Sequence, residues 1–236
     1  MWLVADYQPV GLFSLKNSLA TSSGAKSLLL PTPYALKMAL LDAACRRWGV
    51  IQAEASWPTL RDLPVAMRLP KQAVVTNLFA KILKPRRSKA RPGSSDVGPL
   101  GKTIAFREYV WLGGNLGIAL QLAGNHLPRV FELLLQFNYL GKRGSFVQLL
   151  APPRRLTSLP EGFVHLNPPE TPATFSSRGL LQMLDDCGPG VTFEQANIYS
   201  SGRIKMGQER VLHHVVLPYR LVRSSKGYSL YERLDD

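Results

Sequence analysis

The chain has few acidic residues and few of the side chains that bind metals or act in common catalytic motifs. Its 236 residues include 16 Asp and Glu against 29 Lys and Arg, with two cysteines and four histidines. Neither the cysteines, Cys45 and Cys187, nor the scattered histidines have the spacing of a zinc site. No phosphate-binding P-loop and no Ser-His-Asp or Cys-His arrangement can be identified. We therefore expect no metal and no cofactor.

Long hydrophobic runs are also missing. No window has the length of uninterrupted apolar sequence that a membrane span needs, and no strongly basic amphipathic helix of the interfacial kind is found. The first residues, "MWLVADYQPVGLFSL", lack a basic n-region and carry Asp6 early, so no secretory signal is predicted. We expect a cytoplasmic protein without a membrane partner.

What the chain has is positive charge. The formal net charge is +13 and the isoelectric point is near 10. Such a one-sided excess indicates a polyanionic partner, and nucleic acid is the commonest one. The apolar share of 45% is ordinary for a globular protein, so a packed core is expected.

The first third of the chain predicts a strand, a loop and a helix. Trp2–Pro9 is predicted as the opening strand, and residues 14–27 as a loop rich in Ser and Gly. A helix follows over residues 33–48, with Thr32 as its cap, a proline at its first position and Gly49 at its end. Lys37 falls off the apolar face of this helix.

The middle of the chain predicts strands around a turn-rich loop. Residues 72–84 are predicted as a strand and residues 85–101 as a loop rich in Pro, Gly and Ser. Residues 102–112 and 115–122 are predicted as two strands joined by a hairpin turn at the Gly113-Gly114 pair.

A second helix, over about residues 126–140, and a strand over Phe146–Leu150 complete the set. Without the insertion, the order is the β-α-β-β-α-β order of a ferredoxin-like α+β fold, which the RNA recognition motif shares. Both helices should pack on one face of a single antiparallel sheet. The side chains expected to be buried there are Leu36, Leu40, Ala44, Val130, Phe131 and Leu134.

Two regions follow from this order. Residues 1–152 are assigned to an RRM-like domain with an inserted basic hairpin at about residues 81–111. Residues 153–236 are assigned to a small, mostly β C-terminal region with one short helix around residues 177–184.

The inserted hairpin carries much of the positive charge. Between Lys81 and Arg107 there are eight cations and one acid, Asp96. A solvated charged loop is the alternative interpretation, but signs usually mix on such surfaces. The bias favours a hairpin that binds a phosphate backbone, with strong salt dependence.

The stretch "YLGKRGSFVQLL", residues 139–150, places two cations between two glycines. Gly141 could end the preceding helix, and cations in a last turn suit the helix dipole. That interpretation leaves Gly144 unexplained, so the alternative is an anion-binding site made by Lys142, Arg143 and the amides near Gly144.

A catalytic alternative also exists. A metal-independent ribonuclease needs a general base and a cation near the scissile phosphate. His126, Tyr139 and Lys142 lie at the two ends of the second helix and could supply them.

Three segments together resemble a known family. "LPTPYALKMALLDAA" is similar to the proline-led first helix of CRISPR-associated RAMP proteins, specifically the Cas family-five handle-binding subunit. "FREYVWLGGN" resembles the strand that returns from that family's thumb hairpin, and "YLGKRGSFV" its Leu-Gly-basic segment after the second helix. The resemblance covers roughly residues 1 to 150.

The resemblance implies a non-catalytic RNA-binding subunit of a type I Cascade-like surveillance complex, a ribonucleoprotein of antiviral defence. Such a subunit grips the 5′ repeat-derived handle of the CRISPR RNA and caps the backbone RAMP subunits. It also adjoins the large subunit and meets target DNA indirectly. An endoribonuclease that processes the CRISPR RNA precursor, and a generic RNA-binding protein, remain the alternatives. The residues expected to bind RNA are Lys26, Lys84, Arg86, Arg87, Lys89, Arg91, Lys102, Arg107, Tyr139, Lys142, Arg143, Gly144 and Ser145.

Overall fold

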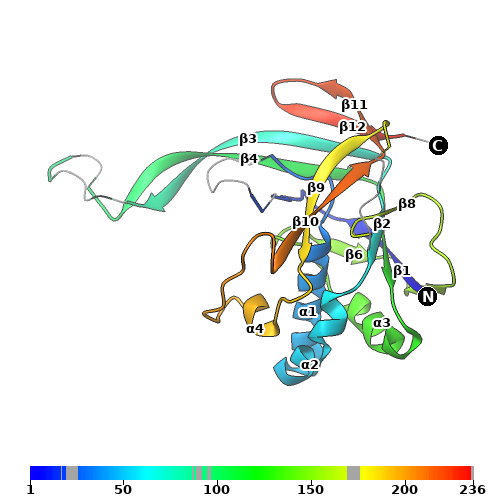
Figure 1. Ribbon diagram of the computed structural model, residues 1–236. Helices are drawn as coiled ribbons and strands as arrows, with labels where there is room; N and C mark the ends of the chain where they lie inside the picture. Colours follow the sequence, from blue (N-terminus) through cyan, green and yellow to red (C-terminus); the bar gives the residue numbers. More distant parts are fainter. Residues whose placement is uncertain are drawn as a thin grey trace.

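The computed structural model describes residues 1–16, 18–19, 26–86, 88, 92–94, 97–168 and 176–234. The strands are β1 (Trp2–Pro9), β2 (Val65–Arg68), β3 (Gln72–Pro85), β4 (Leu100–Gly113), β5 (Leu116–Gln121), β6 (Val147–Leu149), β7 (Arg154–Leu156), β8 (Phe163–His165), β9 (Leu180–Cys187), β10 (Arg210–Leu217), β11 (Tyr219–Ser224) and β12 (Tyr228–Arg233). The helices are α1 (Pro33–Trp48), α2 (Val50–Arg61), the short 3₁₀ turn η1 (Gly124–His126), α3 (Leu127–Gln136) and α4 (Phe193–Ala196) (Figure 1).

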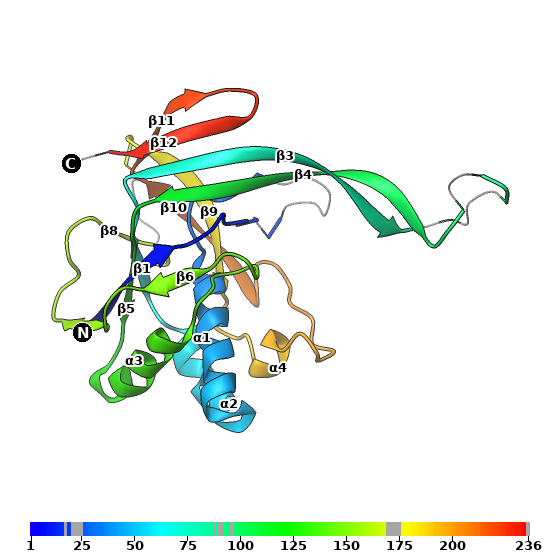
Figure 2. The same ribbon diagram turned by 180° about the vertical axis from the view of Figure 1, so that it is seen from behind.

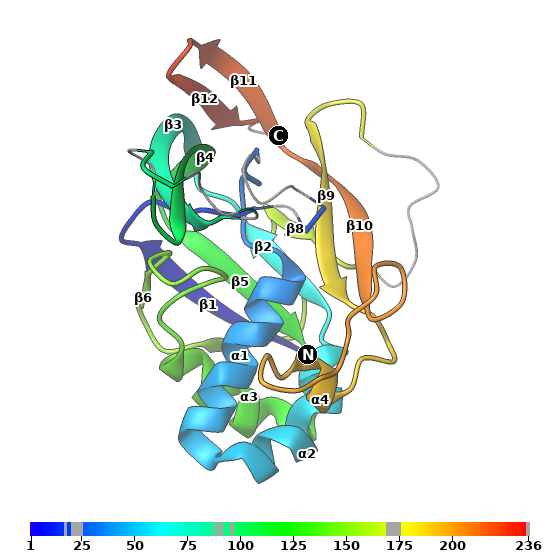
Figure 3. The same cartoon turned by 90° about the vertical axis from the view of Figure 1, so that its left-hand side faces the viewer.

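The central sheet has the strand order β6-β1-β5-β2-β8, with antiparallel pairing throughout. Its β6-β1-β5-β2 part is the strand arrangement of a ferredoxin-like fold, so the predicted fold class is confirmed. Helix α1 crosses this sheet, and α1 and α3 pack on one of its faces (Figure 3). Tyr7 of β1 ties sheet to helix, because its hydroxyl donates to the carbonyl oxygen of Leu134 at 2.6 Å.

The predicted core of the two helices is largely confirmed. Leu36, Leu40 and Ala44 are fully buried, as are Val130 and Leu134, whereas Phe131 is only partly buried against this core. Helix α1 begins as expected, since the hydroxyl of Thr32 accepts a hydrogen bond from the amide of Ala35 at 3.2 Å.

The second strand of the ferredoxin-like sheet is β2, not the strand predicted over residues 72–84. β2 has four residues between Pro64 and Pro70, which is too short a run to give a clear periodic signal. Residues 72–84 instead lie in β3, which belongs to a second sheet with the order β11-β12-β3-β4. The helix α2 was also absent from the prediction, and it contains Pro58.

The hairpin turn predicted at Gly113-Gly114 is wrong. β4 pairs with β3 along its whole length, while β5 pairs with β1 and β2. The two glycines mark the point where the chain passes from one sheet to the other, with Gly114 at φ 130°. β3 and β4 together form a long arm that projects from the body of the protein (Figure 2). This β3–β4 arm spans residues 72–113, more than the predicted 81–111.

The sheet face opposite the helices is covered by the C-terminal region. Trp2, Val4, Ala66 and Ala119 form a small buried cluster on that face, with Leu156, Leu159 and Phe163 packed against it. In an RNA recognition motif this face meets RNA. In this structure, Leu156, Leu159 and Phe163 pack on that face instead.

The C-terminal region is mostly β, as predicted, but the helix predicted around residues 177–184 is wrong. That segment enters β9, which pairs with β10. An apolar run such as "LLQML" fits a short helix and a strand equally well. The division at residue 152 remains a prediction, although β7 and β8 join the first sheet and β12 pairs with β3. None of the described helices has the length and apolar character needed to cross a membrane.

Candidate nucleic-acid interface

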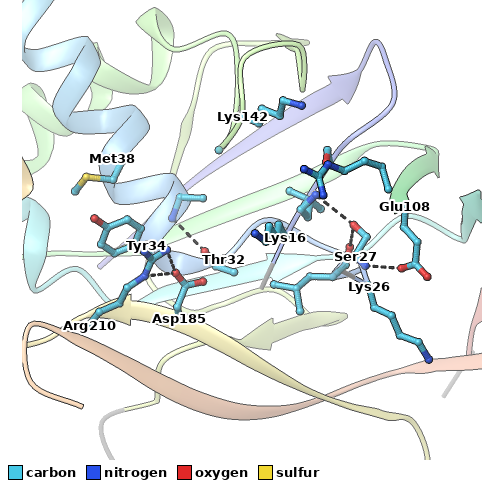
Figure 4. A pocket seen from close by; sticks show the side chains of 16 residues that line it. Lys16, Lys26, Ser27, Thr32, Tyr34, Met38, Glu108, Lys142, Asp185 and Arg210 are labelled. Atoms are coloured by element: carbon cyan, nitrogen blue, oxygen red, sulfur yellow. Dashed lines mark hydrogen bonds and ion pairs between the residues drawn. The ribbon is translucent and has the colours of Figure 1, made fainter. Parts of the chain in front are cut away.

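A basic cavity of about 440 Å³ lies between the start of α1, the N-terminal loop, the loop after α3 and one end of the β9–β10 pair (Figure 4). Its charged lining residues are Lys16, Lys26, Arg107, Lys142 and Arg210, with Glu108 and Asp185. Three of these cations, Lys26, Arg107 and Lys142, are among the residues predicted to bind RNA. The cations outnumber the acids by three, so the cavity favours an anion.

Both acids of the basic cavity are already bound by protein groups. The carboxylate of Glu108 accepts a hydrogen bond from the amide of Ser27. Asp185 accepts one from Nε of Arg210 at 2.6 Å. With Arg210 paired to Asp185, the exposed side chains of Lys16, Lys26 and Lys142 supply most of the remaining positive charge, together with Arg107 and against the charge of Glu108.

One wall of the basic cavity is an aromatic and cationic pair. The guanidinium of Arg210 lies 4.0 Å from the ring centroid of Tyr34, within cation–π range. Burial raises the pKa of the Tyr34 hydroxyl, although the nearby Arg210 acts in the opposite direction. Tyr34 therefore stays protonated at neutral pH and can donate a hydrogen bond.

The N-terminal loop forms the other wall. Lys16 and Ser27 form an antiparallel bridge, and the amide of Leu28 donates to the carbonyl oxygen of Leu15 at 2.8 Å. This pairing holds Lys16 and Lys26 on neighbouring strands of backbone. The sequence offered a signal for Lys16, since it lies in the same Ser- and Gly-rich loop as Lys26.

The interpretation of Gly141 as a helix cap is wrong. Helix α3 ends at Gln136, and its last turn is closed by the amide of Phe137, which donates to the carbonyl oxygen of Leu133 at 3.3 Å. Gly141 therefore lies well beyond the helix.

The two glycines instead build a tight turn. Tyr139 and Phe146 form an antiparallel bridge, and the amide of Leu140 donates to the carbonyl oxygen of Ser145 at 3.1 Å. Gly141 and Gly144 have φ values of 73° and 102°, which side chains with a Cβ rarely adopt. The turn presents Lys142 to the basic cavity (Figure 4).

Other predicted residues around this turn have different positions. Arg143 and Gly144 are exposed but do not line the basic cavity. Ser145 is buried, with its hydroxyl 3.5 Å from the amide of Ser14, so it holds the turn against the N-terminal loop. Tyr139 is partly buried.

The predicted cations of the β3–β4 arm lie away from the basic cavity, except for Arg107. Lys84 pairs with Gly101 and Lys102 with Leu83, which puts the two lysines on opposite faces of the arm. The amide of Arg86 donates to the carbonyl oxygen of Pro99 near the tip. Arg87, Lys89 and Arg91 lie outside the described residues.

One face of the arm combines aromatic, apolar and basic side chains. Phe79 is 70% exposed and its ring centroid lies 5.1 Å from that of Phe106. Ile104, which pairs with Lys81, is 62% exposed on the same face.

The structure does not bring His126 and Lys142, two residues of the catalytic alternative, into one site. His126 lines a separate cavity of about 90 Å³ with Trp48 and Arg129, whereas Lys142 lines the basic cavity. Within the part of the chain that the structure describes, no group of three His, Cys, Asp or Glu side chains could hold a metal ion.

Sequence reasoning missed Tyr34, Asp185 and Arg210 at the basic cavity. Arg210 lies 176 residues after Tyr34 in the sequence, and the pairing of β10 with β9 brings it to the cavity. Nothing in the local sequence of Arg210 signals this contact.

No protein-family model matches the chain. Among curated proteins, it is 27% identical over 111 residues to the CRISPR-associated protein Cas5 of Archaeoglobus fulgidus. The match includes 47% of this chain and 46% of the relative, so it extends over about half of the length of each protein.

Two solved structures share the fold. The first is described as the crystal structure of a CRISPR protein from Archaeoglobus fulgidus, with a TM-score of 0.50, 13% identity, and coverage of 100% of this chain and 92% of the other. The second is a chain of a CRISPR RNA-guided surveillance complex, with a TM-score of 0.50, 11% identity, and coverage of 91% and 87%. The shared fold agrees with the sequence match: the chain is similar in sequence to the CRISPR-associated protein Cas5 and similar in fold to CRISPR proteins of solved structure.

Proposed function

We propose that the chain is an RNA-binding subunit of a type I Cascade-like surveillance complex and holds the 5′ handle of the CRISPR RNA in the basic cavity. The observation that carries this proposal is the excess of cations in the basic cavity, where both acids are bound by protein groups. Lysines attract phosphates as point charges, and an arginine fixed by a carboxylate keeps its remaining donors in a defined plane.

The geometry supports a bent single strand better than a duplex. The basic cavity is a concave site of about 440 Å³, which suits one or two nucleotide units rather than a groove-reading element. Tyr34 and Arg210 offer a flat polar wall to a base, and Lys142 reaches in from the glycine turn. Arg143 and Gly144, on the outer side of that turn, extend the same surface.

The β3–β4 arm is proposed to contact RNA and the adjoining backbone RAMP subunit. Its exposed Phe79 and Ile104 suit a protein or a base, and Lys81 and Lys102 suit phosphates. Lys84, on the opposite face of the arm, and Arg86 are proposed to add contacts to RNA, as are Arg87, Lys89 and Arg91, which lie outside the described residues. The large subunit and, indirectly, target DNA complete the proposed set of partners.

A binding experiment with a labelled repeat-derived RNA in EDTA tests the proposal. The variant carries Lys16→Gln, Lys26→Gln and Lys142→Gln, which removes three positive charges from the basic cavity. The matched control carries Arg155→Gln, Arg223→Gln and Lys226→Gln, which removes three exposed charges elsewhere. We expect the cavity variant to bind at least about tenfold more weakly, with a shallower salt dependence.

Two outcomes would contradict the proposal. Equal losses in the cavity variant and its control would show that only net charge matters. Cleavage of the RNA by the wild-type protein in EDTA would favour the processing endoribonuclease instead.

A further inference from the structure

A second cavity, at the other end of the β9–β10 pair, has no part in the proposed RNA site. It has a volume of about 630 Å³ and is lined by residues of β2, β8, the segment just before β9, and the ends of β10 and β12. Arg210 at the basic cavity and Val216 at this one are six residues apart on β10, which is roughly 20 Å of extended strand. The two cavities are therefore separate sites.

Three arginines and one acid line this second cavity, which we call the arginine cavity. The arginines are Arg68, Arg178 and Arg233, and the acid is the exposed Glu161. The arginine cavity thus has an excess of two positive charges, in side chains that recognise phosphate with paired donors.

Two of these arginines are held in place by protein groups. Nη2 of Arg68 donates to Asp6 at 2.6 Å, and its guanidinium lies 5.5 Å from the ring centroid of Phe163. Nη1 of Arg233 donates to the carbonyl oxygen of Leu69 at 2.7 Å. A guanidinium has five donors, so each retains donors for a ligand in an orientation that the protein has already fixed.

Apart from these charged residues, Gly162 and Ser176, the lining is apolar. Phe163, Val216 and Pro218 form a wall beside the arginines. A ligand that matches both the arginines and this apolar wall has an anionic group and a flat, weakly polar body. The volume of the arginine cavity falls within the range of small-molecule sites.

We propose that the arginine cavity binds a nucleotide unit, with the phosphate on Arg68, Arg178 and Arg233 and the base against Phe163, Val216 and Pro218. The unit is a free mononucleotide or the terminal nucleotide of a strand, since both present the same chemistry. This site does not depend on the proposed RNA function of the basic cavity.

Calorimetric titration of the full chain with adenosine 5′-monophosphate, adenosine, inorganic phosphate and a 5′-phosphorylated trinucleotide tests the site. The monophosphate is expected to bind about tenfold more tightly than adenosine or phosphate alone, because only it uses both parts of the lining. Tighter binding of the trinucleotide would identify a strand end as the source, and tighter binding of the monophosphate a free nucleotide.

Variants assign the binding to this cavity. Arg178 is exposed, so the Arg178→Gln variant is expected to fold normally and to bind the monophosphate about tenfold more weakly than the wild type. The Arg178→Glu variant should bind it more weakly still. Arg223→Gln, an exposed change of the same charge on β11, should leave the affinity unchanged. Because Arg178 lines the arginine cavity and not the basic cavity, a loss of affinity in Arg178→Gln also separates the two sites.

Several results would overturn the inference. They are equal affinity for the monophosphate and for phosphate, no saturation at millimolar ligand, or an equal loss in the Arg178→Gln and Arg223→Gln variants. Binding of a hexaglutamate peptide without binding of the monophosphate would replace the nucleotide with an acidic protein segment.

Discussion

Lys37 of α1 and Asp186 of β9 form a buried ion pair. Nζ of Lys37 lies 2.8 Å from both oxygens of the carboxylate, and the two side chains are 2% and 4% exposed. Asp186 also accepts hydrogen bonds from the side chain of Asn167 and from the amide of Cys187, each at 2.7 Å. The neighbouring Asp185 points to the opposite side of β9 and holds Arg210 at the basic cavity. The pair therefore fixes the position of a wall of that cavity.

Removal of Lys37 should destabilise the protein strongly. Lys37→Met leaves the carboxylate of Asp186 buried without its cation, and loss of one partner of a buried pair costs about 3–5 kcal/mol. Urea unfolding at pH 7 measures the change. Lys71→Met, at an exposed lysine, should change the free energy of unfolding by less than about 0.5 kcal/mol. Addition of Asp186→Asn to Lys37→Met should recover part of the loss, and no recovery would contradict this explanation.

The same lysine shows where sequence reasoning stops. Lys37 falls off the apolar face of its helix, a position that normally faces water, yet it is among the most buried side chains. Its partner is 149 residues away, and only the tertiary fold brings the two together. In contrast, the cap of α1 at Thr32 and its apolar face follow from residues a few positions apart, and both predictions are confirmed.

Elements with local signals were predictable and elements that depend on pairing were not. β1, α1, α3 and the two long strands of the arm have clear periodicity or caps. β2 is stabilised by neighbouring strands on both sides, and its own four residues carry little signal. At the basic cavity, the position of Lys142 between two glycines is a signal in the local sequence, whereas Arg210 required knowledge of the β9–β10 pair.

The packing of Phe163 on the sheet face opposite the helices should be sensitive to substitution of Gly117. A Cβ at this position would lie 2.8 Å from Cζ of Phe163 and 3.0 Å from Cβ of Arg68. Gly117→Ala therefore has to displace the ring of Phe163, and overpacking of this kind costs about 1–3 kcal/mol in a denaturant unfolding experiment. Gly124→Ala, where nothing lies within 4 Å of the added Cβ, is the control. Equal stability of both variants would show that the ring of Phe163 can move away at no cost in free energy.

His213 should make the folded state less stable at acidic pH. Burial lowers the pKa of His213 below its ordinary value of 6.5, although Asp186, 3.8 Å away, acts in the opposite direction. The unfolded chain therefore binds a proton on this residue at a higher pH than the folded chain does. This contribution is fully present above about pH 7.5 and is lost as pH falls through 6.5 toward the lower folded-state value.

Urea unfolding between pH 8 and pH 5.5 measures that effect. The His213→Gln variant should lose less stability over this range than the wild type does. His214→Gln, at an exposed residue of the same strand, should follow the wild-type profile. Parallel profiles for wild type and His213→Gln would show that other groups dominate the acid response.

The turn between Gly141 and Gly144 allows the charge and the shape of the basic cavity to be tested separately. Because α3 ends at Gln136, Lys142 and Arg143 are too distant to stabilise its dipole, so replacement of both with Gln should leave the melting temperature unchanged. The affinity for a 5′ handle RNA should fall by roughly 1–3 kcal/mol, since charge-assisted contacts to phosphate are lost. Most of the loss should come from Lys142→Gln, because Lys142 lines the cavity and Arg143 does not.

Gly144→Ala keeps every charge, but it strains a backbone at φ 102° and should move Lys142, so it should also weaken RNA binding. Fluorescence anisotropy with labelled RNA at two salt concentrations separates these effects: Lys142→Gln should flatten the salt dependence, whereas Gly144→Ala should weaken binding less and leave more of the slope. If the double Gln variant binds as tightly as the wild type at matched salt, then this turn has no part in RNA binding.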